Sequence, residues 1–201
     1  MPRSKHLILA STSRYRRELL SRLQLPFDVV APDVEETPRA GEAPRALALR
    51  LALAKARAVA VSHRDSVVIG SDQVAEVDAE PIGKPGDHPG AVAQLRKLQG
   101  RDVQFHTAVA VLQRSSGFEQ ADVATVAVRF RNLSDADIAA YLRLEQPYDC
   151  AGSARCEALG IALLERIDSD DPTALIGLPL IRTARLLRAV GIDPLRAPDG
   201  D

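Results

Sequence analysis

Apolar and polar residues alternate in short blocks at the start of the chain. An apolar run from His6 to Ala10 predicts a buried strand, and it stops at the small residues Ser11-Thr12-Ser13. A helical pattern follows from Ser13 to Leu23 and ends before Pro26. A second, shorter strand is predicted from Phe27 to Val30. The order strand, helix, strand is typical of α/β folds.

A polar segment separates this unit from a long predicted helix. Residues Ala31 to Ala43 are acidic and rich in proline, which predicts a loop. Pro44 suits the first turn of a helix, where its missing N–H costs nothing. Helical spacing then places four apolar residues on one face: Leu47, Leu51, Ala54 and Ala58.

The second half of the chain predicts a long antiparallel hairpin. Two strands, Val103 to Gln113 and Gln120 to Phe130, flank the turn residues Ser115-Ser116-Gly117. Ser134-x-x-Asp137 resembles a capping box that begins another helix. The other predicted elements are a strand from Val67 to Ile69 that leads into Gly70-Ser71-Asp72, a turn from Gly83 to Gly86, a helix from Ala91 to Leu98, a strand from Ile161 to Leu164 and a helix from Pro179 to Val190.

These elements together predict an α/β fold with a mixed β-sheet, a long antiparallel hairpin, flanking helices and a cleft. We expect residues 1–194 to form a single domain, either as one unit or as two lobes around that cleft. Residues 195–201 are expected to form a flexible tail.

Composition and charge narrow the function classes. Of the 201 residues, 46% are apolar and 26% are charged, as in a soluble protein with a substantial core. The net charge of -1 gives no basic field for nucleic acid. Aromatic residues make up only 3%, too few for a protein that stacks single-stranded bases. We therefore expect a small-molecule ligand, with no nucleic acid as partner.

Cysteines and apolar runs bear on the cellular location. Cys150 and Cys156 match no common zinc spacing, and both are expected to be reduced and structural. The N-terminus lacks the apolar region of a signal peptide, and no run approaches the ~20 residues that span a bilayer. We expect a cytoplasmic protein that binds no membrane. The sequence leaves the oligomeric state open, a homodimer included.

Two arginines in the first helix predict an anionic ligand. Arg16 and Arg17 lie in its first turn, where the helix dipole disfavours cations. A strand that leads into a helix also directs free N–H groups to one point, beside Ser11 and Ser13. A phosphate would suit the guanidinium fork. The alternative is an exposed helix with Ser13 as N-cap and solvated arginines.

Four further residues could act on such a ligand. Asp72 follows a buried strand, where it could be a catalytic acid, a metal ligand or only a turn carboxylate. Lys55 lies among alanines in the long helix, and Lys84 lies in a Gly-Lys-Pro turn. Either lysine could hold a phosphate oxygen or extend into solvent. Glu36, next to Glu35 in the acidic loop, could bind Mg²⁺ or be solvated.

In this order along the chain, these residues resemble the Maf family of nucleoside triphosphate pyrophosphatases, whose fold is ITPase-like. The resemblance runs from about residue 7 to residue 194 and rests on order and coverage rather than on one motif. One departure is Arg14, where many members have a proline that would preset the helical turn. The matching segments are Leu9-Ala10-Ser11-Thr12-Ser13 with Arg16-Arg17, Glu36, Lys55-Ala56, Gly70-Ser71-Asp72-Gln73-Val74, Gly83-Lys84-Pro85, Phe105-His106-Thr107, Cys150-Ala151-Gly152-Ser153 and Gly177-Leu178-Pro179-Leu180.

The resemblance implies a cytoplasmic enzyme that hydrolyses a nucleoside triphosphate to the monophosphate and pyrophosphate. It implies a divalent cation, Mg²⁺ or Mn²⁺, as cofactor. Asp72 falls on the family's catalytic proton acceptor. Arg16, Lys55 and Lys84 fall on phosphate-binding positions, and Glu36 falls near the metal with Asp72.

Within the family, the chain is most similar to the branch of 7-methyl-GTP pyrophosphatases. The similarity lies in Tyr15, Gln73 and the stretch from Cys150 to Glu157. A 7-methylguanine ring is positively charged and would stack well on an aromatic face such as Tyr15. Glu157 could accept hydrogen bonds from guanine N–H groups, and Gln73 could contact the base or the sugar. The alternative is a surface tyrosine and an ordinary helix-start carboxylate.

The hypothesis for the reaction is attack of water on the α-phosphorus. Asp72 would orient or deprotonate the water, and the basic residues would neutralise the leaving pyrophosphate. Two alternatives remain open at this stage. One is a pyrophosphatase of the dTTP/UTP type, and the other is a regulatory nucleotide-binding protein that affects cell division.

Overall fold

The computed structural model describes residues 5–196, so residues 197–201 of the expected tail lie outside it. Pro194–Arg196 form a short 3-10 helix. In chain order the elements are β1 (Leu7–Ala10), α1 (Arg14–Ser21), β2 (Asp28–Val30), α2 (Pro44–Ala60), β3 (Val67–Val77), β4 (Glu80–Ile82), α3 (His88–Leu98), β5 (Asp102–Gln113), β6 (Phe118–Phe130), α4 (Asp135–Glu145), η1 (Ala151–Ser153), η2 (Leu159–Leu163), β7 (Leu164–Asp168), η3 (Ala174–Ile176), α5 (Leu180–Ala189) and η4 (Pro194–Arg196).

One mixed sheet organises the described residues. Its strand order is β2-β1-β3-β5-β6-β7, and β4 pairs with β3 outside this path. β1 lies parallel to both β2 and β3, whereas β5, β6 and β7 are joined by antiparallel pairing. The predicted α/β fold with a mixed sheet and flanking helices is confirmed.

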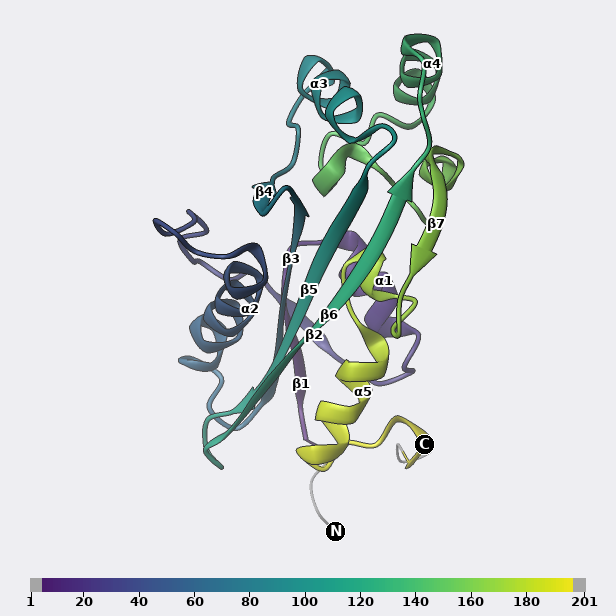
Figure 1. The fold of residues 1–201 in the computed structure, drawn as a ribbon. Coiled ribbons are helices and arrows are strands. Elements are labelled where there is room, and N and C mark those ends of the chain that lie inside the picture. The colour runs from purple at the N-terminus through teal and green to yellow at the C-terminus, as the bar shows by residue number, and fades with distance from the viewer. Residues whose placement is uncertain (1–4, 197–201) are drawn as a thin grey trace.

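Helices cover both faces of the sheet (Figure 1). Side chains of β1 alternate between the faces, as strand geometry requires. Ile8 packs in the cluster that contains α2, whereas Leu7 and Leu9 pack with residues of α1 and α5. All four residues of β1 are buried, so the strand forms an apolar run without polar alternation.

The buried face of α2 differs in part from the predicted one. Leu47 and Leu51 are buried as expected, but Ala54 and Ala58 are only half-buried. Alanines can pack a helix close to a sheet, and they form much of the face that touches β3. The buried residues of α2 are Pro44, Leu47, Ala48, Leu51, Ala52, Lys55, Ala56, Val59 and Ala60. Over residues 5–196, no helix has both the length and the apolar character that crossing a bilayer requires.

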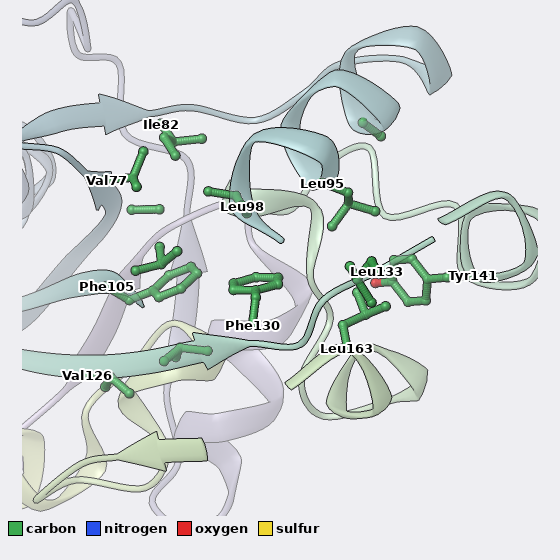
Figure 2. Close-up of a cluster of buried hydrophobic side chains, with 14 of the residues drawn as sticks. Val77, Ile82, Leu95, Leu98, Phe105, Val126, Phe130, Leu133, Tyr141 and Leu163 are labelled. Atoms are coloured by element: carbon green, nitrogen blue, oxygen red, sulfur yellow. The ribbon is translucent and has the colours of Figure 1, made fainter. Parts of the chain in front are cut away.

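A third cluster of buried side chains lies at the end of the hairpin near α3 and α4 (Figure 2). Phe105 and Phe130 contribute from β5 and β6, and Leu95 and Leu98 from α3. The capping box predicted at the start of α4 is present: Ser134 Oγ accepts from the Asp137 N–H, and the Asp137 carboxylate accepts from the Ser134 N–H.

The long hairpin is confirmed, with slightly longer strands than predicted. β5 and β6 pair from Asp102 opposite Arg129 to Gln113 opposite Phe118. Gly117 closes the turn with a φ of 70°, a conformation that glycine adopts without steric cost.

The strand predicted from Ile161 to Leu164 is wrong. Residues Leu159–Leu163 form a 3-10 helix, and the strand β7 begins only at Leu164. The backbone at Gly160 lies very close to that of Arg155. A Cβ added at Gly160 would be only 2.4 Å from the Arg155 backbone nitrogen. β7 pairs with β6 at the edge of the sheet, and its mostly exposed residues present no apolar pattern.

Candidate active-site cleft

A cleft of about 730 Å³ opens beside β3. β1 pairs with β3 only as far as Ala10 opposite Gly70, and β4 starts pairing with β3 at Ala75. The edge of β3 between these two partners, residues 71–74, is therefore not covered by a strand. Every predicted site residue except Arg17 lines the cleft: Ser11, Ser13, Tyr15, Arg16, Glu36, Lys55, Asp72, Gln73, Lys84 and Glu157.

The turn between β1 and α1 forms one wall of the cleft. Ser13 is the N-cap of α1, and its Oγ accepts from the Arg16 backbone N–H. Ser11 is buried and accepts a hydrogen bond from the Ser13 N–H. The helix N-terminus, Ser11 and Arg16 thus lie together at the cleft, as an anion site requires.

Arg16 is fixed by a contact that the sequence did not predict. Its Nε donates to the Gly177 carbonyl at 2.9 Å, and the buried Ser71 hydroxyl donates to the same oxygen at 3.1 Å. Burial lowers the pKa of the Arg16 guanidinium, while the negative charges of Asp72 and Glu36 oppose that shift. The sequence could not reveal this contact, because every residue has a backbone carbonyl. The only indication was that Gly177 lies in a segment that carries the family resemblance.

Arg17 does not reach the cleft. It is exposed on α1 and is absent from the cleft lining. Consecutive residues of an α-helix point about 100° apart, and this rotation turns Arg17 away from the cleft that Arg14, Tyr15 and Arg16 line. Of the two predicted arginines, Arg16 therefore lines the cleft and Arg17 is exposed to solvent.

Asp72 lies within β3 rather than at a strand end. β3 continues to Val77, so the predicted end of the strand at Ile69 is wrong. The position is still special, because Asp72 follows the last parallel pair with β1. Gly70 makes the site possible: a Cβ there would lie 2.2 Å from the Ala52 carbonyl oxygen of α2. Glycine thus allows α2 to approach β3 closely.

Lys55 joins two carboxylates in the cleft. Its Nζ lies 2.6 Å from Asp72 Oδ1 and 2.7 Å from Glu36 Oε1. Lys55 is 6% exposed, so its side chain does not extend into solvent. Asp72 is also buried, whereas the Glu36 side chain is 59% exposed. The chain separates these three residues widely, and packing of α2 on β3 brings them together.

The acidic pair could supply part of the ligand set of a divalent cation. Glu36 and Asp72 supply two carboxylates around one cationic group, which shows that positive charge is accommodated between them. Within residues 5–196, no group of three or more His, Cys, Asp or Glu side chains is arranged to hold a metal. Mg²⁺ commonly uses one or two carboxylates and takes its other ligands from water and substrate phosphates. The residues fit that mode of binding.

Lys84 lies on the loop after β4. Its side chain is exposed, and the residue lines the cleft. The preceding Gly83 carbonyl accepts from Gln94 Nε2 at 2.9 Å, which ties the turn to α3. The lysine is therefore available to a ligand without first breaking an ion pair in the described structure.

Tyr15 and Glu157 meet through an arginine that the sequence did not predict. The Arg155 guanidinium carbon lies 5.4 Å from the Tyr15 ring centroid, and Arg155 Nε lies 3.6 Å from Glu157 Oε1. Arg14 also lies over the ring, at 4.7 Å, and donates to the Tyr15 hydroxyl. The aromatic face thus already attracts cations. Arg155 could have been suspected only from its closeness to Glu157 in the chain.

The Gln73 side chain makes hydrogen bonds within the protein through its Nε2 atom. Its Nε2 donates to Thr107 Oγ1 and to the carbonyls of Ala174 and Leu175 in η3. In a hydrogen bond with a base or a sugar, Gln73 would therefore act as the acceptor, through Oε1. Gln73 also faces the side of the sheet opposite to Asp72, as alternate residues of a strand do.

The two cysteines are free thiols. Burial raises the pKa of Cys150 to about 11 and that of Cys156 to about 12. Both therefore remain protonated at neutral pH, and neither is poised as a nucleophile.

The chain was compared with family models, with named proteins and with solved structures. A family model described as "Maf-like protein" matches residues 6–190. A protein of Polaromonas sp. named 7-methyl-GTP pyrophosphatase is 64% identical over 191 residues, which cover 95% of this chain and 87% of the relative. A protein of Albidiferax ferrireducens with the same name is 62% identical over 98% of both chains. Among solved structures, the Ham1 protein of Staphylococcus aureus is similar with 20% identity and a TM-score of 0.48, over 64% of this chain and 73% of that one.

Proposed function

Because this chain belongs to the Maf family, we propose that it is a pyrophosphatase that hydrolyses 7-methyl-GTP to 7-methyl-GMP and pyrophosphate. The observation that carries the chemistry is the contact of Lys55 with both Asp72 and Glu36 inside the cleft. Relatives with 62% and 64% identity that are named 7-methyl-GTP pyrophosphatase support the choice of substrate.

In the proposed reaction, water attacks the α-phosphorus. The bond between the α-phosphorus and the oxygen that bridges it to the β-phosphorus breaks, and pyrophosphate leaves. Asp72 accepts the proton of the water. Lys55 holds Asp72 Oδ1 at 2.6 Å and so fixes the direction of the carboxylate. When bound, a divalent cation would be held by Glu36 and Asp72 and would add positive charge beside the phosphates.

Basic residues on three sides of the cleft bind the triphosphate in this proposal. Arg16 is oriented by the Gly177 carbonyl, Lys55 lies at the carboxylates and Lys84 reaches in from the loop after β4. Their charges stabilise the negative charge that develops on the leaving pyrophosphate. A protein that acts on such a triphosphate is expected in the cytoplasm.

The base would lie on the ring of Tyr15, which also lines the cleft. Methylation at N7 makes guanine cationic, and both Arg14 and Arg155 already lie over the Tyr15 ring. Exposed Arg14 can be displaced by a base more readily than Arg155, which Glu145 and Glu157 hold. Glu157 then accepts hydrogen bonds from the guanine edge.

The test is release of pyrophosphate from 7-methyl-GTP, GTP, dTTP, UTP, CTP and ITP, each with and without Mg²⁺. We expect a preference for 7-methyl-GTP that requires the metal and is lost in Tyr15→Ala and Glu157→Ala. If dTTP or UTP were hydrolysed faster than 7-methyl-GTP, the protein would still be a nucleoside triphosphate pyrophosphatase. The proposed role of Tyr15 and Glu157 in binding the base would then be excluded. Binding without any turnover would instead support a regulatory nucleotide-binding protein.

A further inference from the structure

One wall of the cleft is formed in part by a segment without helix or strand. Residues 31–43, the strap, connect β2 to α2 and contain no helix or strand. Pro32, Glu36 and Pro38 of the strap line the cleft. Glu36 therefore depends on contacts of the strap with the rest of the molecule for its position, because no ladder or helix holds it.

Helix α2 binds the strap at two points. Lys55 contacts Glu36 itself. Five residues earlier, Arg50 donates from Nε to Glu42 Oε1 at 2.6 Å and from Nη2 to Glu42 Oε2 at 2.7 Å. The same Nη2 donates to the Thr37 carbonyl at 3.1 Å. Thr37 directly follows Glu36, so Arg50 fixes the backbone next to the functional carboxylate.

The Arg50–Glu42 contact is of the strongest kind among ion pairs. It is a two-point contact between planar groups, and the side chains are only 20% and 10% exposed. Glu42 Oε2 also accepts from the Arg39 backbone N–H at 3.0 Å, which closes the strap on itself. Hydrogen bonds from Arg50 lower the pKa of Glu42 to about 2, so the pair is ionised at neutral pH.

We propose that Arg50, through Glu42 and the Thr37 carbonyl, is a positioning residue that holds the strap so that Glu36 stays opposite Asp72. This inference rests on the proposed function, in which Glu36 and Asp72 receive a divalent cation with the triphosphate. A role in stability alone is the competing explanation. The two differ, because a stability role predicts no local opening of the strap and no change in metal affinity of the folded protein.

The experiment compares Arg50→Met and Arg50→Lys with Arg57→Met as a matched control. Arg57 lies on the same helix and makes a similar two-point contact with Glu119 on β6, outside the cleft lining. Arg50→Lys keeps the charge, but an ammonium cannot reproduce the planar fork to Glu42. Thermal melting of each variant shows that the folded state is being compared.

The first readout is trypsin cleavage after Arg39, an exposed residue of the strap, followed by mass spectrometry of the peptide that begins at Ala40. Loss of charged hydrogen bonds should raise the rate of this cut by about tenfold or more, since cleavage follows the open population. Arg57→Met should be cut at the wild-type rate. An unchanged rate in both Arg50 variants would overturn the proposal.

The second readout is binding of Mn²⁺ in the presence of the α,β-methylene analogue of 7-methyl-GTP, which cannot be hydrolysed between the α- and β-phosphates. Removing a residue that orients a metal ligand typically weakens metal binding by about 10- to 100-fold, and we expect this in Arg50→Met. Unchanged Mn²⁺ affinity despite faster cleavage would also overturn the proposal. If the wild type neither binds Mn²⁺ nor hydrolyses a triphosphate, the proposed function fails, and the cleavage rate alone decides whether Arg50 holds the strap.

Discussion

At the residue scale, the carboxylate of Asp72 is the group on which the proposed chemistry depends most. Asp72→Asn keeps the size of the side chain and its contact with Lys55 but removes the base. We expect kcat to fall by about 10²-fold or more, the usual contribution of a general base. The measurement is pyrophosphate release at saturating substrate.

Asp102→Asn serves as the control for Asp72→Asn. Asp102 makes an exposed ion pair with Arg129 at the start of β5, so its loss should leave kcat unchanged. Near-wild-type turnover in Asp72→Asn would remove Asp72 from the mechanism.

Glu42 is expected to make stability depend on acid pH. Its pKa is lowered from 4.5 to about 2 by Arg50, so the folded state favours the ionised form. The stabilisation is fully present above about pH 4.5 and is lost as the pH falls toward about 2. Urea unfolding should therefore show a difference between wild type and Glu42→Gln that shrinks over this range. A difference independent of pH would contradict the ionic contribution.

At the element scale, the close approach of α2 to β3 depends on Gly70. In Gly70→Ala the new Cβ would clash with the Ala52 carbonyl oxygen at 2.2 Å and the Ala56 nitrogen at 2.6 Å. The helix must move away, which should cost about 1–3 kcal/mol and separate Lys55 from Asp72. We expect lower thermal stability together with lower kcat/KM.

A second variant shows whether backbone or side chain is responsible at Gly70. The Ala56 Cβ is also close, at 2.9 Å, but the two nearest atoms belong to the backbone of α2. Ala56→Gly should therefore fail to restore activity to Gly70→Ala. Full restoration by this second change would show that the helix backbone can adapt without moving Lys55.

At the scale of the whole molecule, the cleft lies between separate clusters of buried side chains. One cluster packs α2 on the sheet, and another lies toward α3 and α4 at the far end of the hairpin (Figure 2). Leu142 of α4 is fully buried in the far cluster and does not line the cleft. Stability and catalysis should therefore be separable by mutation there.

Leu142→Ala is expected to lower the free energy of unfolding by about 2–5 kcal/mol through loss of packing and the cavity left behind. Well below its melting temperature, the folded variant should keep the wild-type KM and kcat. Urea unfolding and steady-state kinetics on the same sample check both expectations. A large rise in KM in fully folded protein would show that the far cluster shapes the cleft.

The sequence by itself determined most elements, and of the site residues that it predicted only Arg17 lies outside the cleft lining. Helix caps such as Ser13 and Ser134, the start of α2 at Pro44 and the long hairpin follow from local patterns. These features depend on neighbours within one turn or along one strand, which is why spacing reveals them. β7 was placed wrongly because an exposed edge strand has no apolar pattern.

Only the tertiary structure decided which of these residues meet. The contact of Lys55 with Asp72 and Glu36, the exclusion of Arg17 and the hold of Arg50 on the strap depend on how α2, α1 and β3 pack. The edge of β3 that opens to the cleft depends on where β1 stops and β4 begins. Such contacts join residues far apart in the chain, and no local pattern encodes the orientation in which two elements pack.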